Sequence, residues 1–380
     1  MRIVLLGPAY PFRGGIATHN ERLAQELLRR GHVVEIFTFT VQYPSFLFPG
    51  KSQYREGSPP EGVRIRRIVH SLEPFSWWRT GKALAKFTPE AVLVKFWLPV
   101  MGVSLGSALR VFHHYHPFVK RIAILHNFLP HESRLGDRVF TRFFVGSVDG
   151  AVAMSAAVAQ DWQACTPKPL RLLFHPLYDH YGAVLPKEEA CAALGLDPAY
   201  RYLLFFGLIR PYKGLDLLLQ AWASEKLQTF SNVRLLIAGE LYESYEAYQP
   251  LLAHPANVGR VIFHEGFVPE EKVKLYFSAA DAVILPYRNA TQSGITQIAL
   301  HFEKPMIATR VGGLPEVIQE GQTGLLCEPT PESLCEAIAQ FLTSDSGYFS
   351  LYLQAAKAQY SWGAFAGALE DFIRSLSHAS

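Results

Sequence analysis

The chain has 380 residues, of which 49% are hydrophobic and 18% are charged, so it is long enough for two globular domains and is not a disordered protein. Its four cysteines follow no metal-ligand or disulfide-framework spacing, which favours reduced thiols in a cytoplasmic protein. The N-terminus enters a strand pattern directly, and no stretch reaches about 18 uninterrupted apolar residues, so we expect neither a cleaved signal peptide nor a membrane span.

The net charge of +3 conceals an asymmetry between the two halves of the chain. Residues 1–183 hold 22 Lys and Arg against 12 Asp and Glu, whereas residues 184–380 hold 14 against 21. A basic first half suits an anionic partner or an anionic membrane surface. Opposite charges would equally help two lobes to close on each other, so both interpretations stay open.

The first half alternates strand and helix patterns. Residues 2–7 form an apolar strand pattern, a glycine-containing loop follows, and residues 16–30 repeat apolar side chains at helical spacing. Further strands are expected at residues 32–38, 62–69, 91–96, 121–127 and 150–154, with helices at 77–87 and 101–114 and another capped by Ser155. Such alternation predicts a parallel sheet with helices on both faces. The glycines of the first loop do not follow the spacing G-x-G-x-x-G, so the sequence does not favour a dinucleotide-binding site.

A proline-containing stretch at residues 168–186 interrupts the alternation and predicts a linker. Beyond it, strands are expected at residues 203–206, 233–238, 261–264, 282–285, 306–309 and 325–326, and a last helix at 365–376. We therefore predict an α/β fold with two doubly wound, Rossmann-like lobes, residues 1–180 and 181–364, and a C-terminal helix within 365–380 that packs back toward the first lobe. In such folds ligands bind at the carboxyl ends of the strands, so we expect a cleft between the lobes.

The stretch 203–222, LLFFGLIRPYKGLDLLLQAW, carries the clearest local signal of the second half. A buried strand leads through a short loop with Arg210 and Lys213 into a helix for which Asp216 is the expected N-cap. Backbone N–H groups at a helix start together with two fixed positive charges suit a phosphate group. An ordinary strand–helix loop with solvated basic residues would share this pattern, and the glycine-rich loops near residues 1 and 293 are what favour a phosphate site.

Seven segments along most of the chain carry a family resemblance. In chain order they are GPAYPFRGGIATHNERLAQELLRRGHVV, LHN, FFGLIRPYKGLDLLLQAW, LLIAGE, VIFHEGFVP, LYFSAADAVILPY and ATQSGITQIALHFEKPMIATRVGGLPEVIQEGQTGLL. With these segments the chain resembles the retaining glycosyltransferases of family 4, which have the two-lobed GT-B fold. The resemblance implies that the second lobe binds a nucleoside-diphosphate sugar, and it leaves the sugar unspecified.

Matching the family's motifs residue by residue implies the donor contacts. Lys213 falls on the lysine that holds the donor diphosphate, whereas Leu208 falls on the arginine, so Arg210 is inferred to reach the diphosphate from a shifted position. Further donor contacts are expected from the loop and helix start at Gln292, Ser293, Gly294 and Ile295. Such enzymes neutralise the leaving diphosphate with cationic side chains and helix starts, and the sequence offers no D-x-D pair, so no metal and no cofactor are expected.

The first lobe contributes a glycine loop and two histidines. Gly14 and Gly15 match the family's glycine loop, where the missing Cβ lets backbone N–H groups approach a phosphate or an acceptor. His126 ends an apolar strand and matches the family's histidine near the transferred sugar, so it would bind a sugar hydroxyl or orient the acceptor. His19 stands where the family often has a histidine in the first helix. A structural role is the alternative for both histidines.

One departure concerns the family's Glu-x7-Glu motif, whose two glutamates map to Ala290 and Ile298. In the family the first glutamate engages the donor sugar and the second engages the ribose hydroxyls. Gln292 or Gln297 would have to replace the lost polar contacts, and the sequence does not decide between them. This departure leaves the identity of the donor open, and to a lesser degree the activity itself.

The combined expectation is a hexosyltransferase that moves a sugar from a nucleotide-sugar donor to a carbohydrate or lipid-linked acceptor in cell-surface glycan biosynthesis. Two alternatives stay open: a subunit of the same fold that binds nucleotide-sugar or a partner without turnover, and a nucleotide-sugar 2-epimerase, for which carboxylates are scarce. No nucleic acid partner is expected.

Peripheral contact with an anionic membrane, at the inner face of the cytoplasmic membrane, is a further expectation. It rests on Trp77, Trp78 and Arg79, which precede Lys82 and Lys86 in a predicted helix. Adjacent tryptophans point in different directions on a helix, so we expect one of the two in the core.

Overall fold

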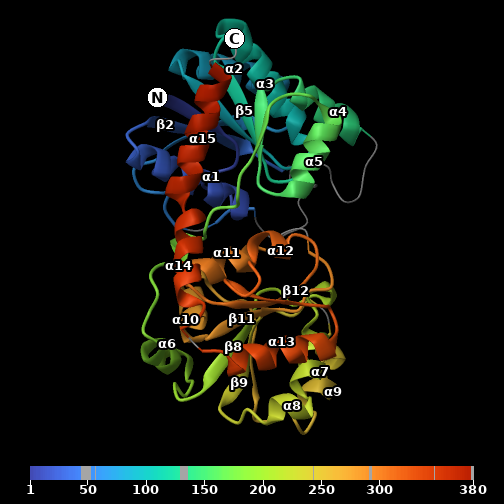
Figure 1. The fold of residues 1–380 in the computed structure, drawn as a ribbon. Helices are drawn as coiled ribbons and strands as arrows, with labels where there is room; N and C mark the ends of the chain where they lie inside the picture. The colour runs from blue at the N-terminus through green and yellow to red at the C-terminus, as the bar shows by residue number, and fades with distance from the viewer. Residues whose placement is uncertain are drawn as a thin grey trace. The chain divides into compact units, whose positions relative to one another are not determined.

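The computed structural model describes residues 1–43, 53–55, 57–128, 136–242, 244–290, 293–345 and 347–377. The chain divides into two compact units (Figure 1). The first unit comprises Met1–His175 together with Trp362–Ser380, and the second unit comprises Pro176–Ser361. Each unit is built around its own parallel sheet, which confirms the predicted fold class. No helix among the described residues is long and apolar enough to cross a membrane.

In the described part of the first unit, seven parallel strands form the sheet. Their spatial order is β3 (Arg64–His70), β2 (Val33–Val41), β1 (Arg2–Leu6), β4 (Ala91–Phe96), β5 (Lys120–Leu125), β6 (Gly150–Ala153) and β7 (Leu170–Leu172). The strand order reverses between β1 and β4, the place where ligands bind in doubly wound folds. The predicted linker is wrong at its start, because β7 pairs with β6 there as a short strand at the edge of the sheet, where flanking prolines are tolerated.

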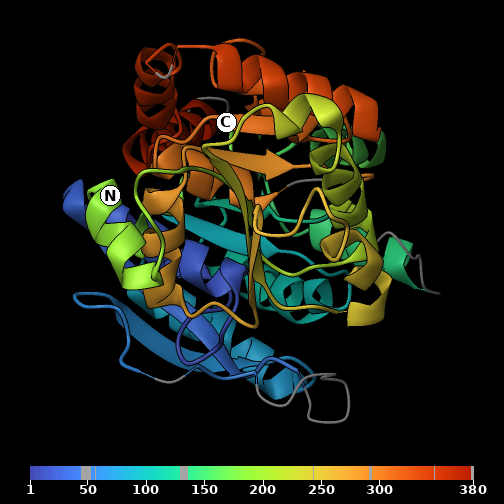
Figure 2. The same cartoon turned by 90° about the horizontal axis from the view of Figure 1, so that it is seen from below.

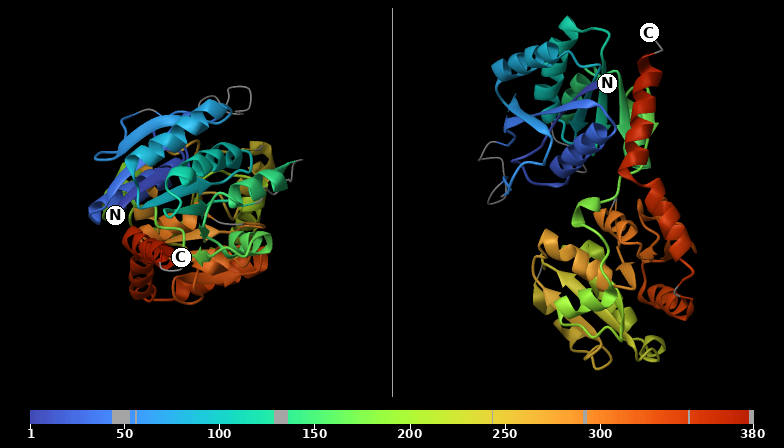
Figure 3. Two further views of the ribbon diagram at one scale, coloured as in Figure 1. Left: turned by 90° about the horizontal axis from the view of Figure 1, so that it is seen from above. Right: turned by 90° about the vertical axis from the view of Figure 1, so that its left-hand side faces the viewer.

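Helices cover both faces of this sheet. They are α1 (Gly15–Arg29) and α15 (Trp362–Ser377) on one face, and α2 (Pro74–Phe87), α3 (Met101–Tyr115), α4 (Asp137–Val145) and α5 (Ala156–Cys165) on the other. Helix α2 begins three residues before the predicted start, because Pro74 fits the first turn of a helix, where no N–H is needed. Figure 3 shows α15, in red, running along this unit, and α15 contacts both α1 and β5.

Side chains of the central strands alternate between two cores. Val4 and Val92 pack with the helices α2 to α5, whereas Leu5, Leu93 and Ile124 pack with α1 and α15. A strand buried on both faces reads as a continuous apolar run, which is how β4 and β5 are recognisable in the sequence. The alternation also fixes the face of any polar residue within these strands.

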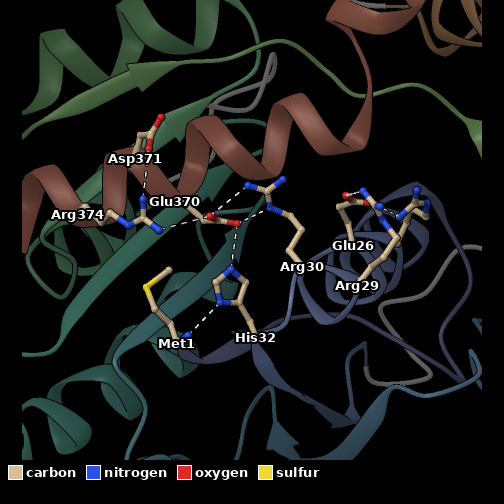
Figure 4. Close-up of polar contacts among 9 residues, drawn as sticks. Met1, Glu26, Arg29, Arg30, His32, Glu370, Asp371 and Arg374 are labelled. Atoms are coloured by element: carbon tan, nitrogen blue, oxygen red, sulfur yellow. Dashed lines mark hydrogen bonds and ion pairs between the residues drawn. The ribbon is translucent and has the colours of Figure 1, made fainter.

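The carboxylate of Glu370 anchors α15 to the first unit (Figure 4). Arg30 donates hydrogen bonds to both of its oxygens, at 2.5 and 3.2 Å, and Nε2 of His32 donates a third at 3.0 Å. The N-terminal amino group of Met1 in turn donates to Nδ1 of His32. The hydrogen bond from Arg30 is the main reason that the pKa of Glu370 falls to about 2.

We predict that Glu370→Gln lowers the free energy of unfolding by about 2–3 kcal/mol at pH 7, since a shift from 4.5 to about 2 corresponds to roughly 3 kcal/mol. The pKa is depressed in the folded state, so this stabilisation is present above pH 4.5 and is lost as the pH falls toward 2. Urea unfolding at pH 7, 5 and 3 tests this, with Glu336→Gln as a control because Glu336 pairs with Lys226 on the surface. An equal loss for both variants would contradict the anchoring role.

The second unit repeats the architecture. Its described strands are, in spatial order, β10 (Val261–Glu265), β9 (Val233–Gly239), β8 (Arg201–Phe206), β11 (Ala282–Leu285), β12 (Met306–Thr309) and β13 (Gly324–Cys327). Its helices are α6 (Lys187–Leu194), α7 (Leu215–Trp222), α8 (Glu225–Gln228), α9 (Gln249–Leu252), α10 (Glu270–Ala279), α11 (Gly294–His301), α12 (Leu314–Val317), α13 (Pro331–Thr343) and α14 (Ser350–Gln359), with 3-10 turns η2 (Asp179–Tyr181), η3 (Pro211–Lys213) and η4 (Tyr245–Ala247). Figure 2 shows α13, in orange-red, along this sheet, where it contacts β12, β13 and α7.

The predicted N-cap of α7 is wrong. Gly214, not Asp216, precedes the helix, with a φ of 68° that glycine adopts without strain. A Cβ at Gly214 would stand 2.0 Å from the carbonyl oxygen of Pro286, so the close approach of these two segments also requires glycine. Asp216 lies in the first turn and accepts two hydrogen bonds of 2.7 Å from Arg288.

Candidate functional site

Lys213 lies at the carboxyl end of the second unit's sheet, in the turn η3 between β8 and α7. Its side chain is 8% exposed, and Nζ lies 5.5 Å from the ring centroid of Tyr287. A Cβ at Gly207 would stand 3.3 Å from the same Nζ, so the amine occupies the space beside the end of β8. Burial first, and then the charge of Arg210, lower the pKa of Lys213 to about 8. No carboxylate pairs with this amine in the described part of the chain.

Arg210 is the second cation of the site, and it is exposed, whereas Lys213 is buried. It directly precedes η3, and its guanidinium lies 4.7 Å from the ring centroid of Tyr242. Leu208, in the position of the family's arginine, is 38% exposed and carries no charge. The guanidinium of Arg210 is therefore the exposed positive charge of this loop, where an anion can reach it.

The start of α11 lies beside the same lysine. Ser293 precedes the helix without capping it by its side chain, and its hydroxyl lies 3.3 Å from that of Tyr287. The side chain of Ile295 reaches within 3.5 Å of the Cβ position at Gly207. Helix starts leave backbone N–H groups without intrahelical acceptors, and here the first turn carries no acidic residue. The structure therefore brings Lys213, Ser293, Gly294 and Ile295 together, whereas Gln292 lies outside the described residues.

The two positions of the missing glutamates are filled by the core. Ala290 is 8% exposed, and its carbonyl oxygen accepts a hydrogen bond from Gly313 N–H. Ile298 is 4% exposed within α11. Gln297, one of the two glutamines considered as a replacement, is buried, and its Oε1 has no partner among the described residues. Oε1 of Gln297 therefore has the capacity for a further polar contact.

The first unit places its predicted residues around the start of α1 and the end of β5. Gly14 has a φ of 119°, an uncommon conformation for other residues, and Gly15 is the first residue of α1. His126 directly follows β5, and its Nε2 is buried without a partner in the described part of the chain. Burial first, and then the charges of Lys95 and His175, lower the pKa of His126 well below its usual value.

Lys95 is a site residue that the sequence analysis did not identify. It is completely buried in β4, on the face toward α1 and α15, because Leu93 two residues earlier lies on that face. The parallel register pairs Leu6 with Val94, so Gly7 lies opposite Lys95. A Cβ added at Gly7 would lie 2.8 Å from both Cβ and Cγ of Lys95. Its Nζ donates a 2.8 Å hydrogen bond to Nδ1 of His19. A lysine inside an otherwise apolar strand was the signal for it.

His19 lies next to both Lys95 and His126. It is 2% exposed, and its ring centroid lies 5.0 Å from that of His126 and 4.9 Å from that of Trp362 at the start of α15. Burial is the main reason that its pKa is lowered, with the charge of Lys95 second. The predicted contact residue His19 therefore lies beside His126, at the same edge of the sheet.

Comparison with solved structures identifies the fold. Sucrose-phosphate synthase from Thermosynechococcus elongatus matches with a TM-score of 0.68 over 100% of both chains, at 19% identity. HepE from Anabaena, in complex with UDP, matches with a TM-score of 0.68 over 99% of this chain and 100% of that one, at 15% identity. At such identities the likeness shows the fold alone, which is the GT-B fold.

Sequence matches then identify the family. The model named "Glycosyltransferase Family 4" matches residues 13–175, and the model named "Glycosyl transferases group 1" matches residues 186–362. These matches, one in each half of the chain, confirm the resemblance to glycosyltransferase family 4 that the motifs predicted.

Two curated relatives carry the same name. The D-inositol 3-phosphate glycosyltransferase of Segniliparus rotundus is 27% identical over 379 residues, 94% of this chain and 83% of that one. That of Corynebacterium urealyticum is 32% identical over 198 residues, 50% of this chain and 46% of that one. The match to the latter thus spans less than half of the relative's length.

We predict that Lys213→Ala weakens the binding of a nucleoside diphosphate by roughly ten- to a hundredfold, since a charge-assisted hydrogen bond contributes about 1.5–3 kcal/mol. Binding by the native protein should also fall as the pH rises above about 8, because Lys213 loses its proton there. Titration calorimetry with UDP, GDP and ADP between pH 7 and 9.5 measures both effects.

Lys226→Ala is the matched control, because Lys226 is an exposed lysine of the same unit paired with Glu336. Lys213→Arg should keep affinity above pH 8, since a guanidinium stays charged. Unchanged diphosphate affinity in a folded Lys213→Ala protein would remove the phosphate role of this lysine.

Proposed function

We propose that this chain is a retaining glycosyltransferase that moves a sugar from a nucleoside-diphosphate sugar to a carbohydrate or lipid-linked acceptor, in the synthesis of cell-surface glycans. The observation that carries the proposal is the buried amine of Lys213 beside the start of α11, with no carboxylate among the described residues to neutralise it. The names of the relatives, which are glycosyltransferases, and the UDP bound by HepE support a nucleotide-sugar donor.

The chemistry assigns a task to each charged group. As the bond between the sugar's anomeric carbon and the diphosphate oxygen breaks, negative charge grows on the leaving diphosphate. Lys213, Arg210 and the N–H groups at the start of α11 would stabilise that charge, and they are fixed before the reaction begins. The acceptor hydroxyl forms the new bond on the face that the diphosphate leaves, and its proton is released to the diphosphate or to solvent. This scheme needs no metal.

In this proposal His126 and the glycine loop of the first unit bind the acceptor. Burial keeps His126 neutral, so one ring nitrogen donates a hydrogen bond and the other accepts one. A neutral imidazole suits a sugar hydroxyl, which also donates and accepts.

The test is incubation of the protein with UDP-, GDP- and ADP-sugars in the presence of EDTA. We expect slow release of one nucleoside diphosphate without acceptor and, with an accepted carbohydrate, a product whose anomeric configuration by NMR is that of the donor. Inversion of the configuration would contradict the retaining mechanism. Loss of activity in EDTA that Mg²⁺ restores would contradict the metal-free scheme.

A second candidate is binding of nucleotide-sugar without transfer, and the burial of Ala290 and Ile298 favours it. Donor binding by calorimetry together with no diphosphate release for any donor would support this candidate. Absence of both binding and release would exclude the two candidates together.

We also propose that the first unit attaches to anionic membrane surfaces through an aromatic patch formed by Leu72, Phe75 and Trp78. The three side chains are 50%, 60% and 43% exposed, and the rings of Phe75 and Trp78 stack with centroids 5.5 Å apart. Nζ of Lys82 lies 4.2 Å from the Trp78 ring centroid, so a cation flanks the patch.

Of the two adjacent tryptophans, Trp77 points inward, and its indole N–H donates a hydrogen bond to the carbonyl of His70. Aromatic rings flanked by cations suit the headgroup region of an anionic bilayer.

We predict that Phe75→Ser combined with Trp78→Ser reduces co-sedimentation with phosphatidylglycerol vesicles at low salt by severalfold. Phe267→Ser is the matched control, because Phe267 is 70% exposed on the second unit. Binding to phosphatidylcholine vesicles should be weak for all variants, since each Lys or Arg near an anionic surface contributes about 1 kcal/mol. Equal sedimentation of the double variant and the control would exclude the patch as the attachment surface.

A further inference from the structure

The first unit contains a buried basic cluster formed by His19, Lys95 and His126. Lys95 is 0% exposed and His19 is 2% exposed, and the two side chains are joined by a 2.8 Å hydrogen bond. The three residues come from α1, β4 and the end of β5, so they surround one place at the carboxyl edge of the sheet.

The hydrogen-bonding capacity of this cluster is only partly used. A protonated lysine offers three N–H donors, and His19 Nδ1 accepts one of them. Nε2 of His19 and Nε2 of His126 are both buried, and neither has a partner among the described residues. Buried polar groups in native proteins are nearly always paired, so an unpaired set in one place points to a site that can bind a polar ligand.

Among the described residues, the surroundings of the cluster supply no negative charge. Beside the cluster's own members, His175 acts on His19 and His126, and the rings of Trp362 and Phe365 on α15 pack against His19. Glu21 on α1 pairs instead with Arg55 and with the N–H of Tyr10. In the part of the chain that the structure describes, no carboxylate bonds to Lys95, His19 or His126.

We propose that His19, Lys95 and His126 bind a phosphate group carried by the acceptor. A phosphate would supply the missing countercharge and accept hydrogen bonds from several directions, as three donors on three separate segments require. The start of α1, which has no acidic residue in its first turn, adds a favourable dipole at this edge. That the phosphate belongs to the acceptor rests on the proposed function, whereas the phosphate site itself does not.

The lowered pKa values of the three side chains add a measurable consequence. Burial lowers the pKa of all three side chains, and a bound phosphate would favour their charged forms. Phosphate binding near pH 7.5 should therefore take up protons from the buffer. Calorimetry in buffers of different ionisation enthalpy measures this uptake directly.

The test is titration of the full chain with inorganic phosphate, with acetate as the planar anion for comparison. We expect saturable phosphate binding with proton uptake, at least tenfold weaker in Lys95→Met and weakened in His126→Gln. UDP binding should be unchanged in Lys95→Met, and phosphate binding should persist in Lys213→Ala. Arg171→Met is the matched control, since Arg171 is an exposed basic residue of the same unit.

Several outcomes would overturn the proposal: no phosphate binding by the native chain, equal phosphate affinity in Lys95→Met, tighter binding of acetate, or displacement of the phosphate by UDP, which would place it in the donor site. The Lys95 amine is buried and bonds only to His19 among the described residues, so its removal relieves a desolvation cost. The thermal unfolding midpoint of Lys95→Met should therefore be unchanged or raised. A lowered midpoint with phosphate affinity retained would show that Lys95 is structural. Failure of UDP binding alone would count against the proposed function and not against this site.

Discussion

The parallel pairing of the strands is the constraint on which both sites depend. In a parallel sheet all strands end at the same edge, so residues that follow different strands meet there although they are far apart in the sequence. In the first unit this edge gathers Gly7, Lys95 and His126. In the second unit it gathers Gly207 and Tyr287 beside the start of α11. Each set lies next to the point where the strand order reverses.

Each unit holds a buried lysine amine at this edge without an acidic partner among the described residues. Lys213 lies beside an aromatic ring and the backbone at Gly207, whereas Lys95 lies beside two histidines. Burial of an unpaired cation costs stability, because the charged form loses its hydration, and a lowered pKa is the physical response. The anionic ligands proposed for the two sites would supply the countercharge that each amine lacks among the described residues.

The positions that match the two family glutamates hold small or apolar, buried residues in this chain. The carbonyl of Ala290 accepts a hydrogen bond from Gly313, and Ile298 is buried within α11. The backbone N–H groups of Gly294 and Ile295 do not depend on either glutamate, because they result from where the helix begins. Diphosphate recognition can therefore persist while contacts to the sugar and the ribose change, and the buried Gln297 is positioned to contribute to those contacts.

Local patterns in the sequence determined the repeated elements and predicted one of the two candidate sites. Strands β4, β11 and β12 begin and end at the predicted residues, because buried strands show as short apolar runs between turn residues. Lys213 and the start of α11 were predicted because motif and loop chemistry are local in the sequence.

Only the tertiary structure decided the surroundings of Lys95 and the start of α7. Alternation within β4 gives the face of Lys95, but its neighbours come from α1, β5 and α15, and strand register and helix packing bring them together. Asp216 was expected as a cap from its residue type, whereas contact with Pro286 placed the turn at Gly214. Both cases have one physical reason: the free energy of these positions is set by groups distant in the sequence, which no local pattern contains.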